Sequence, residues 1–144
     1  MISLENVNTK SHARTVILQC LCEYDLVDHD IVPLVSRIFD NSVFSNEATQ
    51  FLKNTIEKFQ DNQSDIDQII SHNAPTWPID QLPTVDRNIL RLALAEIIWV
   101  KQAPSAVVVN EAVELANRYS DEQGRKMING ILRRLQSTIH VEIG

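Results

Sequence analysis

The segment TVDRNILRLALAEI, residues 84–97, places four charged side chains in a pattern that otherwise predicts a buried helix. Arg87 and Arg91 lie four residues apart on one helical face, where like charges disfavour a helix by a few tenths of a kcal/mol unless acids pair with them. Arg91 and Glu96 are five residues apart and cannot pair within the helix. We therefore expect the two arginines to reach carboxylates on neighbouring helices or on a partner protein, because a guanidinium binds both well.

Patterns that would support catalysis or metal binding are missing from the sequence. It contains no glycine-rich phosphate loop, no Gly-x-Ser-x-Gly turn and no metal-ligand spacing. Glu111 and Glu114 resemble a carboxylate pair but are better interpreted as a solvated helix edge. Cys20 and Cys22 point to nearly opposite sides of a helix, which favours buried reduced thiols over a disulfide or a shared metal. We predict a protein that is not an enzyme and that has no metal and no cofactor.

Composition and charge distribution limit the possible partners. The 144 residues carry a net charge of −6, with the acidic surplus in residues 1–72 and a slight positive excess in residues 101–134. Such a chain binds nucleic acid only through a local cationic patch, because its overall field repels phosphate. No apolar run is long enough to span a membrane, and the N-terminus lacks the features of a signal peptide, so we expect a cytoplasmic protein.

Apolar spacing predicts an all-α fold of six or seven helices. The proline-rich stretch APTWPIDQLP divides a single domain, residues 1–144, into an N-terminal subdomain (1–73), a connector (74–83) and a C-terminal subdomain (84–144). The expected helices cover residues 10–26, a segment starting at Asp30, residues 46–71 with a weak point at QDNQSD, residues 84–100 capped by Thr84, a segment capped by Ser105, and a last helix opened by a Ser120–Gln123 capping box.

Three blocks in the C-terminal half, in fixed order, resemble the NusB family of bacterial transcription antitermination factors. They are DRNILRLALAEI (86–97), VNEAVELANRYS (109–120) and KMINGILRRL (126–135), and ARTVILQCLCEYD (13–25) is similar to the family's first helix. The resemblance covers residues 84–135 best, and residues 27–73 match only in helical pattern. It implies two packed helical bundles, in agreement with the break at residues 74–83.

The resemblance also implies a function without catalysis. NusB proteins pair with NusE, a small-subunit ribosomal protein, and the heterodimer binds the boxA element of nascent RNA. With other Nus factors, this complex keeps RNA polymerase elongating through ribosomal RNA operons.

Two surfaces carry over from the family by position. RNA contacts in the family come from the beginnings of the first and last helices, which implies six RNA-binding residues here: Lys10, His12, Arg14, Gln123, Lys126 and Met127. The basic cluster is thinner than is usual in the family, so we expect weak RNA affinity without NusE. This RNA-binding interpretation requires the cationic side chains at the start of the first helix to lie close to those at the start of the last helix. The NusE surface maps to Cys22, Asp86 and Arg87, while Asn110, Asn129 and Gly130 are assigned to packing.

Two alternatives remain open from the sequence. One is a protein-interaction or homodimer module with weakened RNA binding, suggested by the acidic charge and the thin basic patch. The other is a relative of the RNA-binding domain of ribosomal RNA cytosine methyltransferases, which carries a similar segment. That enzyme needs a methyl-donor domain after residue 144, so a free-standing protein is favoured.

Overall fold

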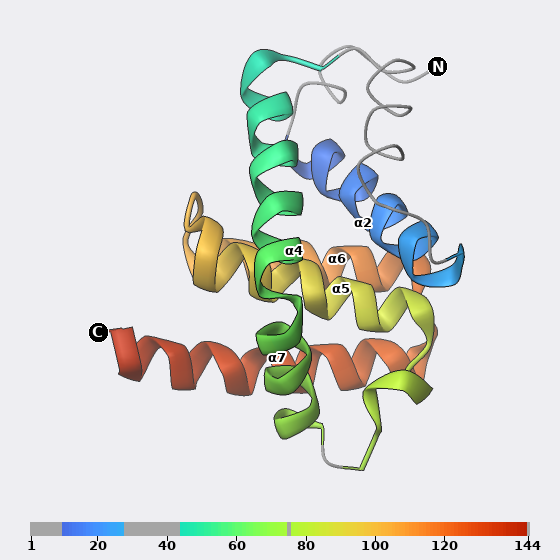
Figure 1. Ribbon diagram of the computed structural model, residues 1–144. Coiled ribbons are helices and arrows are strands. Elements are labelled where there is room, and N and C mark those ends of the chain that lie inside the picture. The colour runs from blue at the N-terminus through green and yellow to red at the C-terminus, as the bar shows by residue number, and fades with distance from the viewer. Residues whose placement is uncertain (1–9, 28–43, 75, 144) are drawn as a thin grey trace.

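The structure is a computed structural model that describes residues 10–27, 44–74 and 76–143, with side chains as far as Thr138. These residues are all helical or loop (Figure 1). The helices are α2 (Lys10–Val27), α4 (Asn46–Asn73), α5 (Thr84–Leu94), α6 (Ser105–Tyr119) and α7 (Glu122–Ile143), with a 3-10 turn at Ile79–Gln81 and a π-helical segment at Ala95–Val100.

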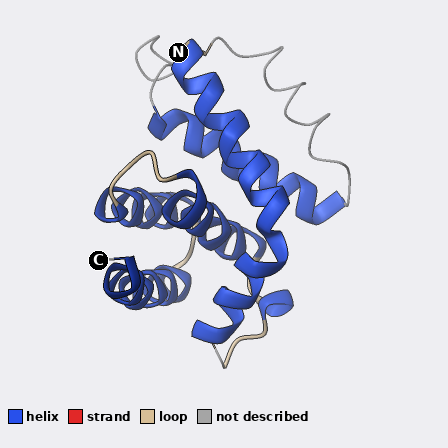
Figure 2. Cartoon of the chain, turned by 60° about the vertical axis from the view of Figure 1, so that its left-hand side comes forward, coloured by secondary structure: helices blue, strands red, loops and turns tan. Residues whose placement is uncertain are grey.

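Helix α5 occupies the centre of the molecule and contacts α2, α4, α6 and α7. Helices α6 and α7 form an antiparallel pair on one side of it, and α4 crosses α5 from the other side (Figures 1 and 2). The central place of α5 explains why its apolar positions extend around most of its circumference. Its residues from Asn88 to Leu94 are all buried.

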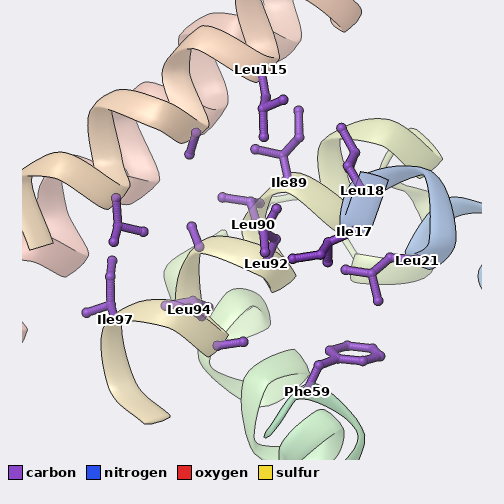
Figure 3. Close-up of a cluster of buried hydrophobic side chains, with 14 of the residues drawn as sticks. Ile17, Leu18, Leu21, Phe59, Ile89, Leu90, Leu92, Leu94, Ile97 and Leu115 are labelled. Atoms are coloured by element: carbon purple, nitrogen blue, oxygen red, sulfur yellow. The ribbon is translucent and has the colours of Figure 1, made fainter. Parts of the chain in front are cut away.

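One continuous hydrophobic cluster joins both halves of the described chain. Figure 3 shows Ile17, Leu18 and Leu21 of α2 facing Ile89, Leu90 and Leu92 of α5, with Phe59 of α4 beside them. Leu115 of α6 reaches the same cluster from the opposite side. The core therefore spans the connector at residues 74–83 and fixes α2 and α4 against α5.

Helix α4 has a defined start and an interruption. Ser45 caps it, because the Ser45 side chain accepts a hydrogen bond from the backbone N–H of Ala48 at 3.1 Å. Asn62 has non-helical backbone angles (φ −127°, ψ 17°), and its amide donates to the carbonyl of Lys58. This kink falls within QDNQSD, the weak point that the sequence predicts.

The π-helical segment Ala95–Val100 was not predicted. Its widened turn shows in the bond from the Lys101 N–H to the Glu96 carbonyl, and Lys101 then ends it in the left-handed region (φ 54°). Short π-helical segments often mark functional positions. Here the segment carries Glu96, a carboxylate that is only 2% exposed.

The start of α7 differs from the predicted capping box. Asp121 is the capping residue, and its carboxylate accepts from the Gly124 N–H at 2.7 Å. Ser120 is turned away and donates instead to Asp86 of α5. The predicted caps Thr84 and Ser105 are also wrong by one position, because each is the first helical residue and follows a proline.

The all-helical class is confirmed for the described residues. The helix expected from Asp30 lies outside them. No helix in the described ranges has the length and apolar character needed to cross a membrane.

Candidate nucleic-acid interface

The first turn of α2 carries two of the predicted RNA-binding residues at the edge of the molecule. Lys10 is half-buried, and its Nζ lies 5.7 Å from the centre of the Phe51 ring. The His12 ring lies 5.7 Å from the ring of Phe44, at an angle of 32°. Both side chains therefore rest on aromatic residues near the start of α4, which limits their motion.

Arg14, which the resemblance implies as an RNA contact, faces inward. It is 3% exposed, and its Nε and Nη2 donate to the two carboxylate oxygens of Glu96, each at 2.8 Å. Its Nη1 lies 4.0 Å from Glu111, whose carboxylate also accepts from the Ser11 hydroxyl at 2.8 Å. Burial alone would lower the pKa of Arg14, but the hydrogen bond and charge of Glu96 outweigh it and raise the pKa. The guanidinium thus holds the start of α2 against α6 and the π-helical segment.

The start of α7 carries the other three predicted RNA-binding residues. Gln123 and Lys126 are exposed, whereas Met127 is half-buried and packs against the core. The Lys126 ammonium lies 3.3 Å from Glu122, and both side chains are about three-quarters exposed, at 77% and 75%. Such an exposed pair is weak and exchanges readily for a phosphate contact. Asp121 and Glu122 make this surface less cationic than the position of Lys126 alone suggests.

The two predicted clusters do not meet in space. Arg14 is bound to Glu96 beyond the C-terminal end of α5, and Gly124 of α7 lies against Asp86 in the first turn of α5. Glu96 lies ten positions after Asp86 in the helix, which corresponds to roughly 15 Å along the axis. Helix α6 lies between them, since Ser11 contacts its middle at Glu111 and α7 packs along it. A ligand that touches both clusters must therefore be extended.

Asp86, predicted at the NusE surface, is buried. It is 2% exposed and accepts a hydrogen bond from the Ser120 hydroxyl. Burial raises the pKa of Asp86, the Ser120 bond opposes that rise, and the charge of Asp121 adds to it. The carboxylate ties the loop between α6 and α7 to α5 and has little surface to offer a partner.

Arg87 is likewise engaged within the chain. Its Nε donates to Asp25 of α2 at 2.8 Å, and its Nη1 donates to the carbonyls of Ile79 and Leu82. Arg91 binds both carboxylate oxygens of Asp67 on α4 at 2.9 Å. The sequence left pairing within the chain and pairing with a partner protein open for these two arginines. The structure shows pairing within the chain, which explains the charges in the central helix.

Asp25 collects donors from three side chains of α5. Arg87 and Asn88 donate to its Oδ2, and Arg91 lies 3.4 Å away. Burial alone would raise the pKa of Asp25, but these hydrogen bonds and positive charges lower it below its usual range. The same charge acts on Cys22, whose pKa is raised to about 11 by burial first and then by Asp25. Cys22 is half-buried and Cys20 is buried, and neither forms a disulfide.

Sequence patterns missed the acids that complete these networks. Asp25, Asp67 and Glu96 were ordinary charges in the sequence, and only their burial beside an arginine reveals their role. The packing role assigned to three C-terminal residues is wrong: Asn110, Asn129 and Gly130 are all exposed. Within the described ranges, no three His, Cys, Asp or Glu side chains gather as a metal site would require.

The described residues form a helical protein with cationic side chains at separate surface positions and arginine–carboxylate pairs inside. A NusB family model matches residues 11–137. The chain belongs to the NusB family, and because that family consists of transcription antitermination proteins, it is not an enzyme.

Relatives and solved structures agree with this assignment. The transcription antitermination protein NusB of Herpetosiphon aurantiacus is 37% identical over 91% of this chain and 92% of its own length. The protein of the same name from Dehalococcoides mccartyi strain 195 is also 37% identical, over 86% and 87%. T. maritima NusB superposes with a TM-score of 0.84 at 31% identity, covering 90% of this chain and 92% of that one. The NusB chain of a NusB–NusE complex with double-stranded RNA gives 0.81 at 26% identity, covering 94% and 99%.

Proposed function

We propose that this chain forms a heterodimer with NusE and binds boxA RNA, and that it supports transcription through ribosomal RNA operons in the cytoplasm. The observation that carries the proposal is the likeness, over almost the whole length of both chains, to a NusB that was solved with NusE and RNA. Other Nus factors and RNA polymerase act with it indirectly.

The RNA-binding residues of this proposal are Lys10, His12, Gln123, Lys126 and Met127. The lysines supply positive charge for phosphates, and the flat ring of His12 and the polarisable Met127 suit contacts with unstacked bases. Arg14 contributes indirectly, by holding the start of α2 in place.

The NusE surface of this proposal lies around Cys22. This side chain is half-buried on α2, so part of it remains open to a partner. Asp86 and Arg87 support that surface from within, through Ser120 and Asp25. Because each helps to fix α5 against a neighbour, their replacement would disturb NusE binding without a direct contact.

An electrophoretic mobility shift of boxA RNA tests the proposal, using the chain alone, NusE alone and both together at two salt concentrations. We expect a strong shift only with both proteins. Lys126→Ala should weaken it, whereas Lys101→Ala, which removes an equal charge from the exposed residue after the π-helical segment, should not. No shift by the mixture would refute RNA binding.

A second candidate is a protein-interaction module with weakened RNA binding. It is favoured by the pairing of Lys126 with Glu122 and by the inward-facing Arg14. In that case NusE still binds, but the RNA shift of the mixture equals that of NusE alone.

A further inference from the structure

Four arginines on α6 and α7 differ from those inside the molecule. Arg14, Arg87 and Arg91 are all bound to carboxylates. Four others are exposed or half-buried, and none lies within 4.0 Å of a carboxylate among the described residues; these are Arg118, Arg125, Arg133 and Arg134. Their charges are therefore available to an anionic partner.

Two of these arginines and Lys126 surround Gly130 on one face of α7. Lys126 precedes Gly130 by four residues, and Arg133 and Arg134 follow it by three and four, so the helical period brings all three cations around the glycine. All four residues are exposed. A side chain added at Gly130 would meet no heavy atom within 4 Å, so the helix backbone is open to close approach there.

The packing of the protein does not explain this glycine. A glycine inside a helix costs about 1 kcal/mol relative to alanine. No neighbouring group occupies the space beside Gly130, so close packing does not require glycine there. Gly124 differs, because its missing side chain leaves room for Asp86. An exposed helix backbone with three cationic side chains around it suits an anionic ligand that can approach the backbone closely.

The two arginines are partly fixed in position before any ligand binds. The Arg133 Nε donates to the Asn129 side chain at 3.3 Å, and the Arg134 Nη2 donates to the backbone carbonyl of Asn73 on α4 at 2.9 Å. A guanidinium has five N–H donors, so each arginine keeps most of its donors for another acceptor. Held guanidiniums lose less side-chain entropy when they bind phosphate.

We propose that the sugar-phosphate backbone of bound RNA crosses α7 over Gly130, between Lys126 on one side and Arg133 and Arg134 on the other. Lys126 and Arg134 are about 12 Å apart along the axis, which makes the contact an extended one. Figure 1 shows α7 as the outermost of the three helices α5, α6 and α7, which run side by side. The inference rests on the proposed function and lengthens its RNA site on α7 by about two turns, from Met127 to Arg134.

Fluorescence anisotropy with labelled boxA RNA, for the chain alone and with NusE, tests this path. Arg133→Gln and Arg134→Gln are measured between about 50 and 200 mM salt, and each should weaken binding about fivefold and reduce the slope of log affinity against log salt by ~0.7. Lys101→Gln removes the same charge from an exposed residue outside α7 and is the matched control. Circular dichroism confirms that each variant is folded.

Substitutions at Gly130 separate the steric contribution to RNA affinity from the electrostatic contribution. Gly130→Gln adds an uncharged side chain over the path and should weaken RNA binding with the salt slope unchanged. Gly130→Ala should weaken binding less while it stabilises the helix, so a loss of binding cannot be attributed to unfolding.

The outcomes distinguish the inference from the proposed function. If wild-type protein binds RNA with NusE and the arginine variants behave like Lys101→Gln, the inference is wrong and the proposed function stands. If the wild-type mixture shows no RNA binding, both are wrong. If the arginine variants lose NusE binding instead, the surface belongs to the protein partner and the inference is again wrong.

Discussion

At the scale of single residues, neighbouring carboxylates decide whether an arginine is buried in an ion pair or exposed to solvent. Arg14 and Glu96 form a buried pair in which the exposed fractions of the side chains are 4% and 3%. Removing one member of such a pair leaves an uncompensated charge in the interior, whereas replacing both by apolar residues of similar size is often tolerated.

Arg14→Met should therefore destabilise the protein by about 3–5 kcal/mol, and the double variant Arg14→Met, Glu96→Met should recover most of that loss. Urea unfolding followed by circular dichroism measures both. RNA binding should also return in the double variant, because we assign Arg14 a positioning role. A double variant that is stable but binds no RNA would show that Arg14 touches the RNA itself.

Asp25 should make stability sensitive to acid. Its pKa is lower in the folded protein than in the unfolded chain, so its contribution is present above the unfolded value of about 3.9 and is lost as the pH falls through the folded value. Asp25→Asn should reduce stability at pH 7 and flatten the loss of stability below pH ~4. Urea midpoints across this range measure the effect. Parallel curves for variant and wild type would contradict it.

Cys22 should be a slow nucleophile. With its pKa raised to about 11, hardly any thiolate is present at neutral pH. Alkylation by iodoacetamide, followed by mass spectrometry, should be much slower than for a free thiol at pH 8 and should accelerate as the pH approaches 11. Asp25→Asn, which removes the second cause of the shift, should increase the rate at pH 8.

At the scale of elements, the contact between α5 and the start of α7 depends on close approach. A side chain built at Gly124 would lie 2.5 Å from a carboxylate oxygen of Asp86 and even closer to the Ser120 hydroxyl. Asp86 and Ser120 form the hydrogen bond that ties the α6–α7 loop to α5. The fit therefore requires glycine at this position.

Gly124→Ala and Gly130→Ala should have opposite effects on stability. Both gain the helical preference of alanine, about 1 kcal/mol, but only Gly124→Ala forces Asp86 and Ser120 apart. Thermal unfolding should show a lower midpoint for Gly124→Ala and a higher one for Gly130→Ala. A higher midpoint for both would mean that the loop adjusts without cost.

At the scale of the whole molecule, a net charge of −6 coexists with arginines on α6 and α7 that have no carboxylate within 4.0 Å among the described residues. The overall field repels phosphate, so close contacts must outweigh it. Screening by salt weakens the long-range repulsion and the close contacts alike. We expect the RNA affinity of the chain alone to show a smaller salt slope than that of its heterodimer with NusE, measured by the same anisotropy titration; equal slopes would indicate that NusE adds no phosphate contacts.

The sequence by itself determined the helical class, because apolar residues at helical spacing need a common core in any fold. It also predicted a weak point in the stretch QDNQSD of α4, where the kink at Asn62 lies, and carboxylate partners for Arg87 and Arg91 on neighbouring helices or on a partner protein. The division at residues 74–83 stays a prediction. Repeating apolar and charged patterns act within one helix, so they can be recognised without knowing its neighbours.

Only the tertiary structure decided which charged residues face solvent. Arg14 and Arg133 both lie in helices, yet one is bound to Glu96 in the core and the other is exposed on α7. Asp86 is buried and accepts a hydrogen bond from Ser120, whereas Gly130 lies on the surface with no heavy atom near its missing side chain. These outcomes depend on how helices far apart in the sequence pack together, and the spacing of residues along one helix carries no information about that packing.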